Sequence, residues 1–370
     1  MDRALYIGLM SGTSLDGVDG VLVDFAPGNG LLLRVLAHAH RPFEPALAAE
    51  LLALNRAGGT DELHRAALAG NAVARRYADV VADLAPPAGV IAIGAHGQTV
   101  RHRPGEFDGT GYTLQLLDPA LLAELTGIDV VADLRSRDVA AGGQGAPLVP
   151  AFHRAVFARA GRDTALLNLG GIANLTALRA DGTTLGYDCG PANALMDLWC
   201  RRHTGASFDA GGAWAASGQV DAALLARLRA EPYFALPAPK STGRDLFHAD
   251  WLDRHLAAAG PTATADVQAT LAELTASVAA DALRRDASQA DELIVCGGGA
   301  ANHHLMQRLA ALLPGVRVMP SDERGLPANQ VEASAFAWLA RAWFERQPGN
   351  LSSVTGARGP RVLGALHPAH

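Results

Sequence analysis

The first residues able to do chemistry lie in a turn between two apolar runs near the start of the chain. Residues 6–25 read Tyr-Ile-Gly-Leu-Met-Ser-Gly-Thr-Ser-Leu-Asp-Gly-Val-Asp-Gly-Val-Leu-Val-Asp-Phe, a pattern that predicts a β-hairpin with hydroxyl groups at its tip. Gly8, Gly12 and Gly17 would let the backbone approach a ligand closely, and an acidic side chain of the turn could hold hydrated Mg²⁺. The tip therefore predicts a phosphate site, with an ordinary hairpin turn as the alternative.

Two later segments carry related patterns. Residues 165–178 place glycines and polar residues between two apolar strands, and residues 292–301 run from a strand into three glycines before a helix over 302–313. A glycine-rich turn that opens a helix leaves unpaired N–H groups for a nucleotide. The two hairpins, half a chain apart, predict two similar halves that close over one nucleotide.

Two other nucleotide-binding patterns fit this sequence less well. A Walker A loop is excluded, because Lys240 is the only lysine of the chain and follows Ala-Pro with no glycine at the required place. The glycines at 297–299, with Asp322 about twenty residues further on, could belong to a dinucleotide fold. Too few residues follow Asp322 for the rest of such a domain, and that reading ignores both hairpins.

Asp188 is the candidate catalytic base. It follows a predicted strand over 185–187 and precedes Cys-Gly-Pro, where Pro191 would start a helix. The positive end of that helix would keep the carboxylate ionised, and such a group can accept a proton late, when the attacking oxygen has become acidic. An N-terminal helix cap is the alternative.

Together these segments resemble the two phosphate elements and the adenosine element of the actin-like/hexokinase ATPase superfamily. Within it, the chain resembles the anhydro-N-acetylmuramic acid kinases from about residue 6 to 345. The motifs that carry this resemblance are residues 10–19, 95–100, 132–150, 188–197, 240–244 and 331–340. The resemblance implies an α/β protein with a two-domain actin-like ATPase (ribonuclease H-like) fold and an interdomain cleft.

The resemblance also implies an activity. It predicts a kinase that uses ATP and Mg²⁺, opens the 1,6-anhydro ring of anhydro-N-acetylmuramic acid with water and phosphorylates O6, giving N-acetylmuramic acid 6-phosphate in peptidoglycan recycling. Asp188 would accept the proton of the attacking water. The implied nucleotide-binding residues are Gly12, Thr13, Ser14, Leu15, Asp16, Gly17, Val18, Asp19, Asn168, Gly170, Gly171, Gly297, Gly298 and Gly299. Asp16 is the candidate metal ligand, through water molecules, and Asp19 is the alternative; either residue could instead merely organise the turn.

For the sugar, the resemblance points to His96, Thr99, Arg135 and Glu332. Arg135 could pair bidentately with the lactyl carboxylate that distinguishes muramic acids from other amino sugars, with a surface ion pair as the alternative. Glu332 stands in the first turn of an apolar helix, so a dipole-favoured cap is its alternative. For His96 the alternative is a histidine satisfied by the core.

The chain departs from the family pattern in two places. Ala192 stands where a second glycine is common, and Asn329-Gln330 replaces a more usual Asp-Trp before Val331. Neither change removes a proposed catalytic group, but the second could alter packing beside the sugar.

Composition limits the partners. The net charge is −6 and no basic run interleaves with aromatic residues, so neither a nucleic-acid groove nor binding to a membrane surface is predicted. The three cysteines lack metal or disulfide spacing, and no segment has 18 consecutive apolar residues, so a cytoplasmic protein with a small-molecule substrate is expected. The pairs His38/His40 and His303/His304 are interpreted as non-metal.

The predicted domains are residues 1–135 and 136–349, with 350–370 as a tail that could pack back on the first. Helical periods are expected near 63–84, 191–204, 219–230, 266–287 and 329–346, and strands at 90–95, 112–117 and 128–132. Asp118-Pro119 predicts a capped helix start. Segments 136–150 and 231–243, rich in proline or glycine, are the expected hinge and surface loop.

Two rival functions remain at this stage. An ordinary sugar kinase of the same fold would phosphorylate an existing hydroxyl and would need no water-activating Asp188. An actin-like sensor would bind ATP without sugar chemistry. A homodimer is expected from the resemblance alone.

Overall fold

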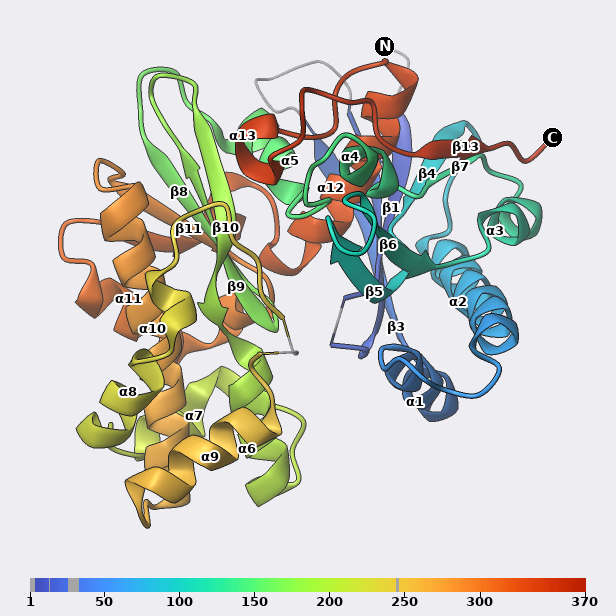
Figure 1. The fold of residues 1–370 in the computed structure, drawn as a ribbon. Coiled ribbons are helices and arrows are strands. Elements are labelled where there is room, and N and C mark those ends of the chain that lie inside the picture. The colour runs from blue at the N-terminus through green and yellow to red at the C-terminus, as the bar shows by residue number, and fades with distance from the viewer. Residues whose placement is uncertain (1–3, 13, 26–32, 244–245) are drawn as a thin grey trace. The chain divides into compact units, whose positions relative to one another are not determined.

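In the computed structural model the chain forms two compact units (Figure 1). The first unit contains residues 1–156 and 330–370, and the second contains residues 157–329. The structure describes residues 4–12, 14–25, 33–243 and 246–370. Thr13, one of the predicted nucleotide-binding residues, lies outside the described residues.

The first unit is built from strands and helices in alternation. Its strands are β1 (Leu5–Met10), β2 (Gly17–Asp24), β3 (Arg34–Pro42), β4 (Val90–Ala95), β5 (Gln98–Pro104), β6 (Gly111–Leu116), β7 (Val130–Ala132) and β13 (Ala365–His367). Its helices are α1 (Pro45–Leu54), α2 (Glu62–Leu84), α3 (Pro119–Thr126), α4 (Ser136–Ala140), α5 (Val149–Phe157), α12 (Val331–Phe344) and α13 (Ser352–Thr355).

The main sheet of the first unit has the order β13-β7-β4-β1-β2-β3. Strands β1, β2 and β3 are antiparallel neighbours, whereas β4 and β7 continue the sheet in parallel with β1. Strand β13 closes the other edge, antiparallel to β7. The C-terminal segment therefore does pack on the first unit.

The second unit also combines one sheet with several helices. Its strands are β8 (Thr164–Leu169), β9 (Ile172–Leu178), β10 (Thr184–Pro191), β11 (Glu292–Cys296) and β12 (Arg317–Pro320). Its helices are α6 (Asn193–Thr204), α7 (Ala213–Ser217), α8 (Ala222–Arg229), α9 (Ala249–Ala259), α10 (Thr264–Asp286) and α11 (His303–Leu312). Short 3₁₀ helices span Ala210–Gly212, Pro232–Ala235, Gly298–Ala301, Ser321–Arg324 and Ala328–Gln330.

The sheet of the second unit has the order β10-β9-β8-β11-β12, with an antiparallel β8–β9–β10 meander followed by two parallel strands. This is the order of β3, β2, β1, β4 and β7 in the first unit. The predicted duplication is thus confirmed, and with it the two-domain actin-like, ribonuclease H-like fold. The antiparallel meander is inconsistent with the dinucleotide alternative. The interdomain cleft stays a prediction.

The compact units differ from the predicted domains at both boundaries, since the chain passes between units at 156/157 and 329/330. Segment 136–150 is no hinge between them, because it is tied within the first unit by the buried Asp138. That carboxylate accepts hydrogen bonds from Gly145 N at 2.8 Å, Asn350 Nδ2 at 2.6 Å and Thr355 Oγ1 at 2.8 Å. Helix α12, predicted to belong to the second domain, packs instead on β1 and β4.

Most predicted elements are present close to their expected bounds. The capped start at Asp118 is confirmed, because its Oδ1 accepts a hydrogen bond from Leu121 N at 2.9 Å. Strands β3 and β5 were not predicted. Their sequences, Arg-Val-Leu-Ala-His-Ala-His-Arg-Pro and Gln-Thr-Val-Arg-His-Arg-Pro, combine polar residues with only partial burial, so neither gives a strong apolar signal.

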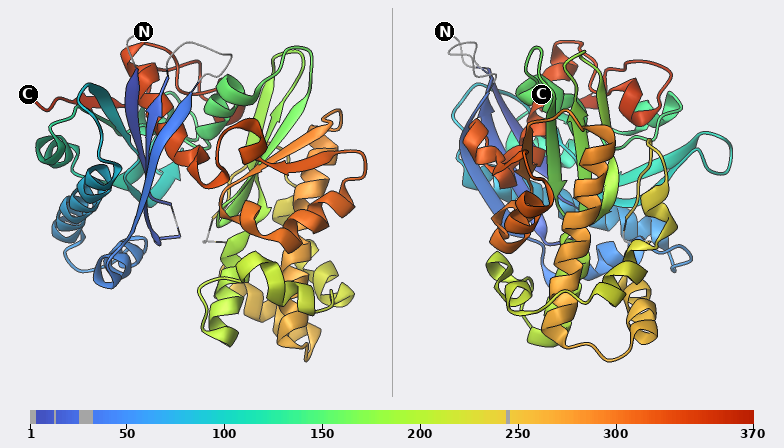
Figure 2. Two further views of the ribbon diagram at one scale, coloured as in Figure 1. Left: turned by 180° about the vertical axis from the view of Figure 1, so that it is seen from behind. Right: turned by 90° about the vertical axis from the view of Figure 1, so that its left-hand side faces the viewer.

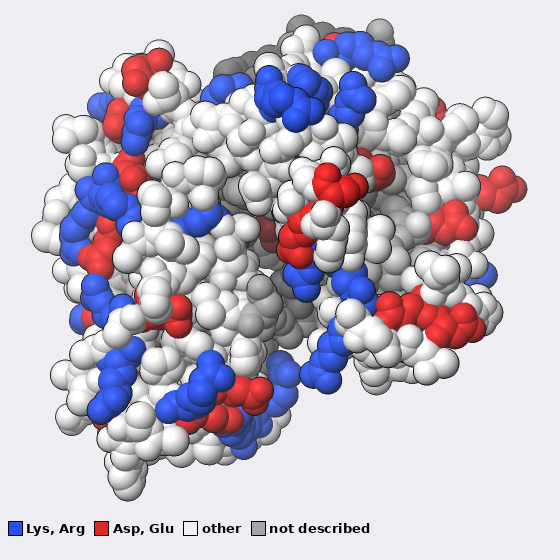
Figure 3. Space-filling model, viewed as in Figure 1, with Lys and Arg blue, Asp and Glu red and all other residues white. Residues whose placement is uncertain are grey.

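Exposed ion pairs cover much of the surface. Acidic and basic side chains are interspersed across both units on the face shown in Figure 3, and exposed bidentate pairs such as Arg41–Asp83 and Arg202–Asp253 join neighbouring elements. Because exposed pairs contribute little to stability, each unit depends mainly on its own apolar core.

Helices α12 and α2 cover opposite faces of the main sheet of the first unit, as Figures 1 and 2 show. A Cβ atom built on Gly8 of β1 would lie 1.8 Å from Ala333 O of α12, and one on Gly94 would lie 2.0 Å from Phe336 O. A Cβ atom on Gly20 would instead meet Val80 of α2 at 2.4 Å. Gly8 therefore allows close helix packing, and not the ligand approach expected from the sequence.

This packing predicts the effect of a single methyl group. We expect Gly8→Ala to lower the free energy of unfolding by about 1–3 kcal/mol, because overpacking against backbone atoms forces the helix to move. Urea unfolding followed by circular dichroism would measure this.

Gly70→Ala is the matched control. Gly70 lies inside α2, where a Cβ atom would meet nothing closer than 3.5 Å, so alanine should leave stability equal or raise it by up to about 1 kcal/mol. Equal losses in the two variants would contradict the packing argument.

Candidate active site

The tip of the first hairpin connects β1 to β2. Within it, Leu15 N donates to Gly12 O at 3.3 Å, and Ser14 Oγ donates to Asp16 Oδ1 at 2.7 Å. Gln98 Nε2 donates to Gly12 O at 3.1 Å and ties the tip to β5. A Cβ atom on Gly12 would have no neighbour closer than 3.6 Å, so the backbone is open to a ligand at this point.

The two acidic residues of this turn lie in different surroundings. Asp16 is exposed and accepts the Ser14 hydroxyl, whereas Asp19 Oδ1 lies 3.2 Å from His38 Nε2 and 3.1 Å from His40 Nδ1. The sequence did not reveal that these histidines share Asp19. Among the described residues, no three His, Cys, Asp or Glu side chains form a group able to hold a metal ion. Asp16, reaching a hydrated ion through water, remains the simpler candidate.

The second hairpin and the triple glycine lie side by side in the second unit. Gly297 has φ +80°, and a Cβ atom there would lie 2.5 Å from Asn168 Oδ1 and 2.8 Å from Leu169 O. The Gly170 and Gly171 carbonyls accept hydrogen bonds from the backbone at the start of α6. The structure thus brings the predicted residues Asn168, Gly170, Gly171 and Gly297 together with Gly298, whereas Gly299 faces Leu169.

Asp188 lies inside β10 and is not at a helix start. The strand continues to Pro191, and α6 begins at Asn193 with Ala192 as its N-cap, so the helix-cap alternative is wrong. Asp188 is only 9% exposed. Since no helix starts at Asp188, groups other than a helix N-terminus must stabilise its carboxylate.

Both oxygens of Asp188 accept hydrogen bonds. Asn174 Nδ2 donates to Oδ1, and Thr242 N donates to Oδ2 at 2.9 Å. Tyr233 OH donates to the Asp188 carbonyl at 2.6 Å, and Asp188 N donates to Lys240 O at 3.3 Å. This arrangement matches an ionised carboxylate, which accepts at both oxygens, and it fixes the direction in which the side chain points.

Asn174 belongs to a polar row that sequence reasoning missed. Cys296, Asn168, Asn174 and Asp188 are direct partners across β11, β8, β9 and β10. Asn168 Nδ2 donates to Asn174 Oδ1 at 3.3 Å, and Cys296 Sγ donates to Asn168 Oδ1 at 3.7 Å. Because the carboxylate only accepts, it sets the orientation of both amides. A polar residue within the apolar strand Ile172–Leu178 was the available signal.

Two of the four sugar candidates contact each other. His96 is buried; its Nδ1 donates to Ser11 O at 3.1 Å, and its Nε2 accepts from Arg135 Nη2 at 2.9 Å. Arg135 Nη1 also donates to Gly145 O at 2.8 Å. Burial, reinforced by Arg135, lowers the pKa of His96 to about 3. His96 is therefore neutral, and it positions Arg135.

The other two sugar candidates, Thr99 and Glu332, lie on β5 and α12. Thr99 Oγ1, on β5, accepts a hydrogen bond from Gln115 Nε2 at 3.2 Å. Glu332 is half-buried in the first turn of α12. The Phe336 ring of the same helix lies 4.8 Å from the His96 ring, so α12 connects Glu332 to the His96–Arg135 pair.

The repeated fold, its glycine-rich turns and the carboxylate held by an amide row define a phosphotransferase of the actin-like ATPase class. The family model described as anhydro-N-acetylmuramic acid kinase matches residues 4–369. Curated relatives of that name, from Variovorax paradoxus and Albidiferax ferrireducens, are 64% and 60% identical, each over at least 99% of both chains. The chain belongs to the anhydro-N-acetylmuramic acid kinase family.

Likeness to solved structures is more distant. The activator of the 2-hydroxyisocaproyl-CoA dehydratase from Clostridium difficile, with bound ADPNP, aligns with 92% of this chain and 96% of its own at 12% identity and a TM-score of 0.47. A similarity of this degree supports no conclusion about activity. In the part of the chain that the structure describes, no helix is both long and apolar enough to cross a bilayer.

The polar row predicts a positioning role for Asn174. In Asn174→Ala, we expect kcat to fall by about tenfold or more while KM for the sugar changes little, because a general base contributes only when it is correctly placed. The acidic limb of the pH–rate profile should move to higher pH, since the carboxylate loses a donor that favours its charged form.

Asn55→Ala is the control, because Asn55 bonds only its own helix in the first unit. It should leave kcat and the pH profile unchanged. An unshifted profile in Asn174→Ala, with normal kcat, would exclude the positioning role.

Proposed function

We propose that this protein is an ATP-dependent kinase that opens the 1,6-anhydro ring of anhydro-N-acetylmuramic acid and phosphorylates O6, producing N-acetylmuramic acid 6-phosphate during peptidoglycan recycling. The observation that supports this most directly is the buried Asp188, whose oxygens accept hydrogen bonds from Asn174 and Thr242. An ordinary sugar kinase of this fold would need no carboxylate to activate water.

The reaction couples two displacements. A water attacks C1 and gives its proton to Asp188, while the C1–O6 bond breaks and leaves its electron pair on O6. O6 then forms a bond to the γ-phosphorus of ATP, and the bond from this phosphorus to the bridging oxygen breaks to release ADP. The alkoxide expelled by ring opening is thus the nucleophile for phosphorus, so correct placement supplies much of the rate.

The glycine-rich turns would bind the nucleotide. The first turn, residues 12–19, and the second turn, with Asn168, Gly170 and Gly171, would hold the phosphates, and Gly297–Gly299 would lie at the adenosine. The exposed carboxylate of Asp16 suits Mg²⁺, which prefers oxygen ligands and keeps several waters. The ion would neutralise developing charge on the transferred phosphoryl group.

The sugar would bind through Arg135, His96, Thr99 and Glu332. Arg135 would donate to the lactyl carboxylate, and neutral His96 would hold the guanidinium in place through its Nε2 lone pair. A homodimer, expected from the family resemblance, and a cytoplasmic location, expected from the composition, complete the proposal.

The test is ADP release by the purified protein with Mg·ATP, with and without anhydro-N-acetylmuramic acid, together with the product mass. We expect sugar-dependent ADP release and a product heavier by one phosphoryl group plus one water. A product that gains the phosphoryl group alone would indicate an ordinary kinase, and release of ADP without sugar dependence would favour an ATP-dependent sensor.

Asp188→Asn is the variant that completes this test. It removes the proton acceptor, so turnover should fall by about 10²-fold or more while binding of ATP and sugar persists in calorimetry. Retained turnover would remove Asp188 from its role.

Arg135→Ala tests recognition of the lactyl group. We expect weaker binding of the muramic sugar and little change with an analogue that lacks the lactyl group, because only the first substrate carries the carboxylate that Arg135 would pair with. Competition binding with the two sugars would measure this. Equal losses on both would refute the contact.

A further inference from the structure

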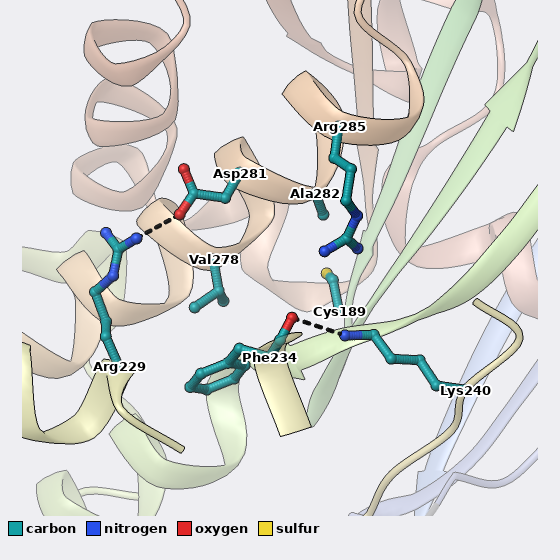
Figure 4. A pocket seen from close by; sticks show the side chains of 8 residues that line it. All are labelled: Cys189, Arg229, Phe234, Lys240, Val278, Asp281, Ala282 and Arg285. Atoms are coloured by element: carbon teal, nitrogen blue, oxygen red, sulfur yellow. Dashed lines mark hydrogen bonds and ion pairs between the residues drawn. The ribbon is translucent and has the colours of Figure 1, made fainter. Parts of the chain in front are cut away.

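One cavity of the second unit is lined by residues to which the proposed reaction assigns no role. It has a volume of about 190 Å³ and is lined by Cys189, Arg229, Phe234, Lys240, Val278, Asp281, Ala282 and Arg285. Figure 4 shows the guanidinium of Arg285 and the ammonium of Lys240 both directed toward the Cys189 side chain, Arg285 from α10 and Lys240 from the segment that follows the 3₁₀ helix Pro232–Ala235. Two cations therefore converge on one small space.

The charges that line this cavity are unbalanced. Asp281 is its only carboxylate, and this group pairs with Arg229 and, at 2.8 Å, with Arg284. Lys240 Nζ donates instead to the carbonyls of Tyr233 at 3.0 Å and Phe234 at 3.2 Å. Among the described residues, no carboxylate forms an ion pair with this ammonium.

The carboxylate that pairs with Arg285 lies outside the cavity, so the excess of positive charge along the cavity wall remains. Its Nε donates to Asp286 Oδ2 at 2.8 Å, and its Nη2 donates to Tyr187 OH at 2.7 Å. Asp286 does not line the cavity. Burial first, and Arg285 second, lower the pKa of Lys240, as expected for two cations that share a partly enclosed space.

We propose that this cavity is a binding site for a small anion, either phosphate or a short carboxylate, held between Lys240 and Arg285. Both groups are charge-assisted donors of the kind that bind such anions. The volume is below the range typical of drug-sized ligands, which excludes a nucleotide. The site is separate from the glycine-rich turns, none of whose residues line it.

The site adjoins the segment that orients Asp188. The main-chain oxygen of Lys240 accepts from Asp188 N, and Thr242 N, two residues further on, donates to the Asp188 carboxylate. Tyr233 also connects Lys240 to Asp188, because its carbonyl accepts a hydrogen bond from Lys240 Nζ and its hydroxyl donates one to the Asp188 carbonyl. An anion bound at Lys240 would therefore act next to the base.

The single lysine allows a direct test. Protein labelled with ¹³C at lysine Cε gives one side-chain NMR signal, because Lys240 is the only lysine. Inorganic phosphate and malonate would be titrated separately at constant ionic strength, with the nucleotide site saturated by a non-hydrolysable ATP analogue. We expect a saturable shift of the signal and a rise in the pKa of Lys240, since an anion favours the charged form; the tighter of the two titrations identifies the ligand class.

Variants separate the cavity from general charge effects. Arg285→Gln should weaken anion binding at least tenfold. If that variant does not fold, Arg229→Gln, on the other wall of the cavity, takes its place and should also weaken anion binding. Arg227→Gln removes the same charge from an exposed position of α8 and should bind normally. A linear, unsaturable shift, equal binding in Arg285→Gln and Arg227→Gln, or binding seen only without the ATP analogue would overturn the proposal.

Discussion

In the second unit, a row of hydrogen bonds fixes the orientation of the buried side chains Asn168, Asn174 and Asp188. An ionised carboxylate offers no proton, so Asp188 forces Asn174 to present its amide nitrogen, and Asn174 in turn orients Asn168. Because these residues are direct partners on adjacent strands, the register of the sheet fixes the row. A one-residue slip would turn every member to the other face. The sheet thus places the proposed proton acceptor and one residue of the proposed nucleotide turn in a single rigid frame.

The two units use the same topology for different tasks. In the first, glycines at β1 and β4 bring α12 close to the sheet, and α12 carries Glu332 and the ring that lies beside His96. In the second, a glycine at the end of β11 leaves room for Asn168. In both, the absence of a Cβ atom decides which backbone can approach. The proposed sugar residues therefore lie in one unit and the proposed base in the other.

Sequence patterns predicted those parts of the structure that have strong local signals. Long amphipathic helices such as α2 and the Asp118 cap follow from periodicity and capping chemistry. The half-polar strands β3 and β5 lack such a signal. Asn174 and Thr242 acquire their roles only through strand register and a loop that returns to β10, and no local pattern encodes either. Gly8 was misread because a glycine that serves helix packing looks the same in sequence as one that serves a ligand.

The boundaries of the units have a consequence for the order of folding during synthesis. The second unit is one continuous stretch, residues 157–329, inserted into the first, whose α12 and β13 come from residues 331–344 and 365–367. A ribosome therefore completes the inserted unit before it makes the helix that covers β1 and β4. During that interval the face of the sheet beneath α12 is uncovered, and exposed apolar surface of this kind favours misassembly in partly folded chains.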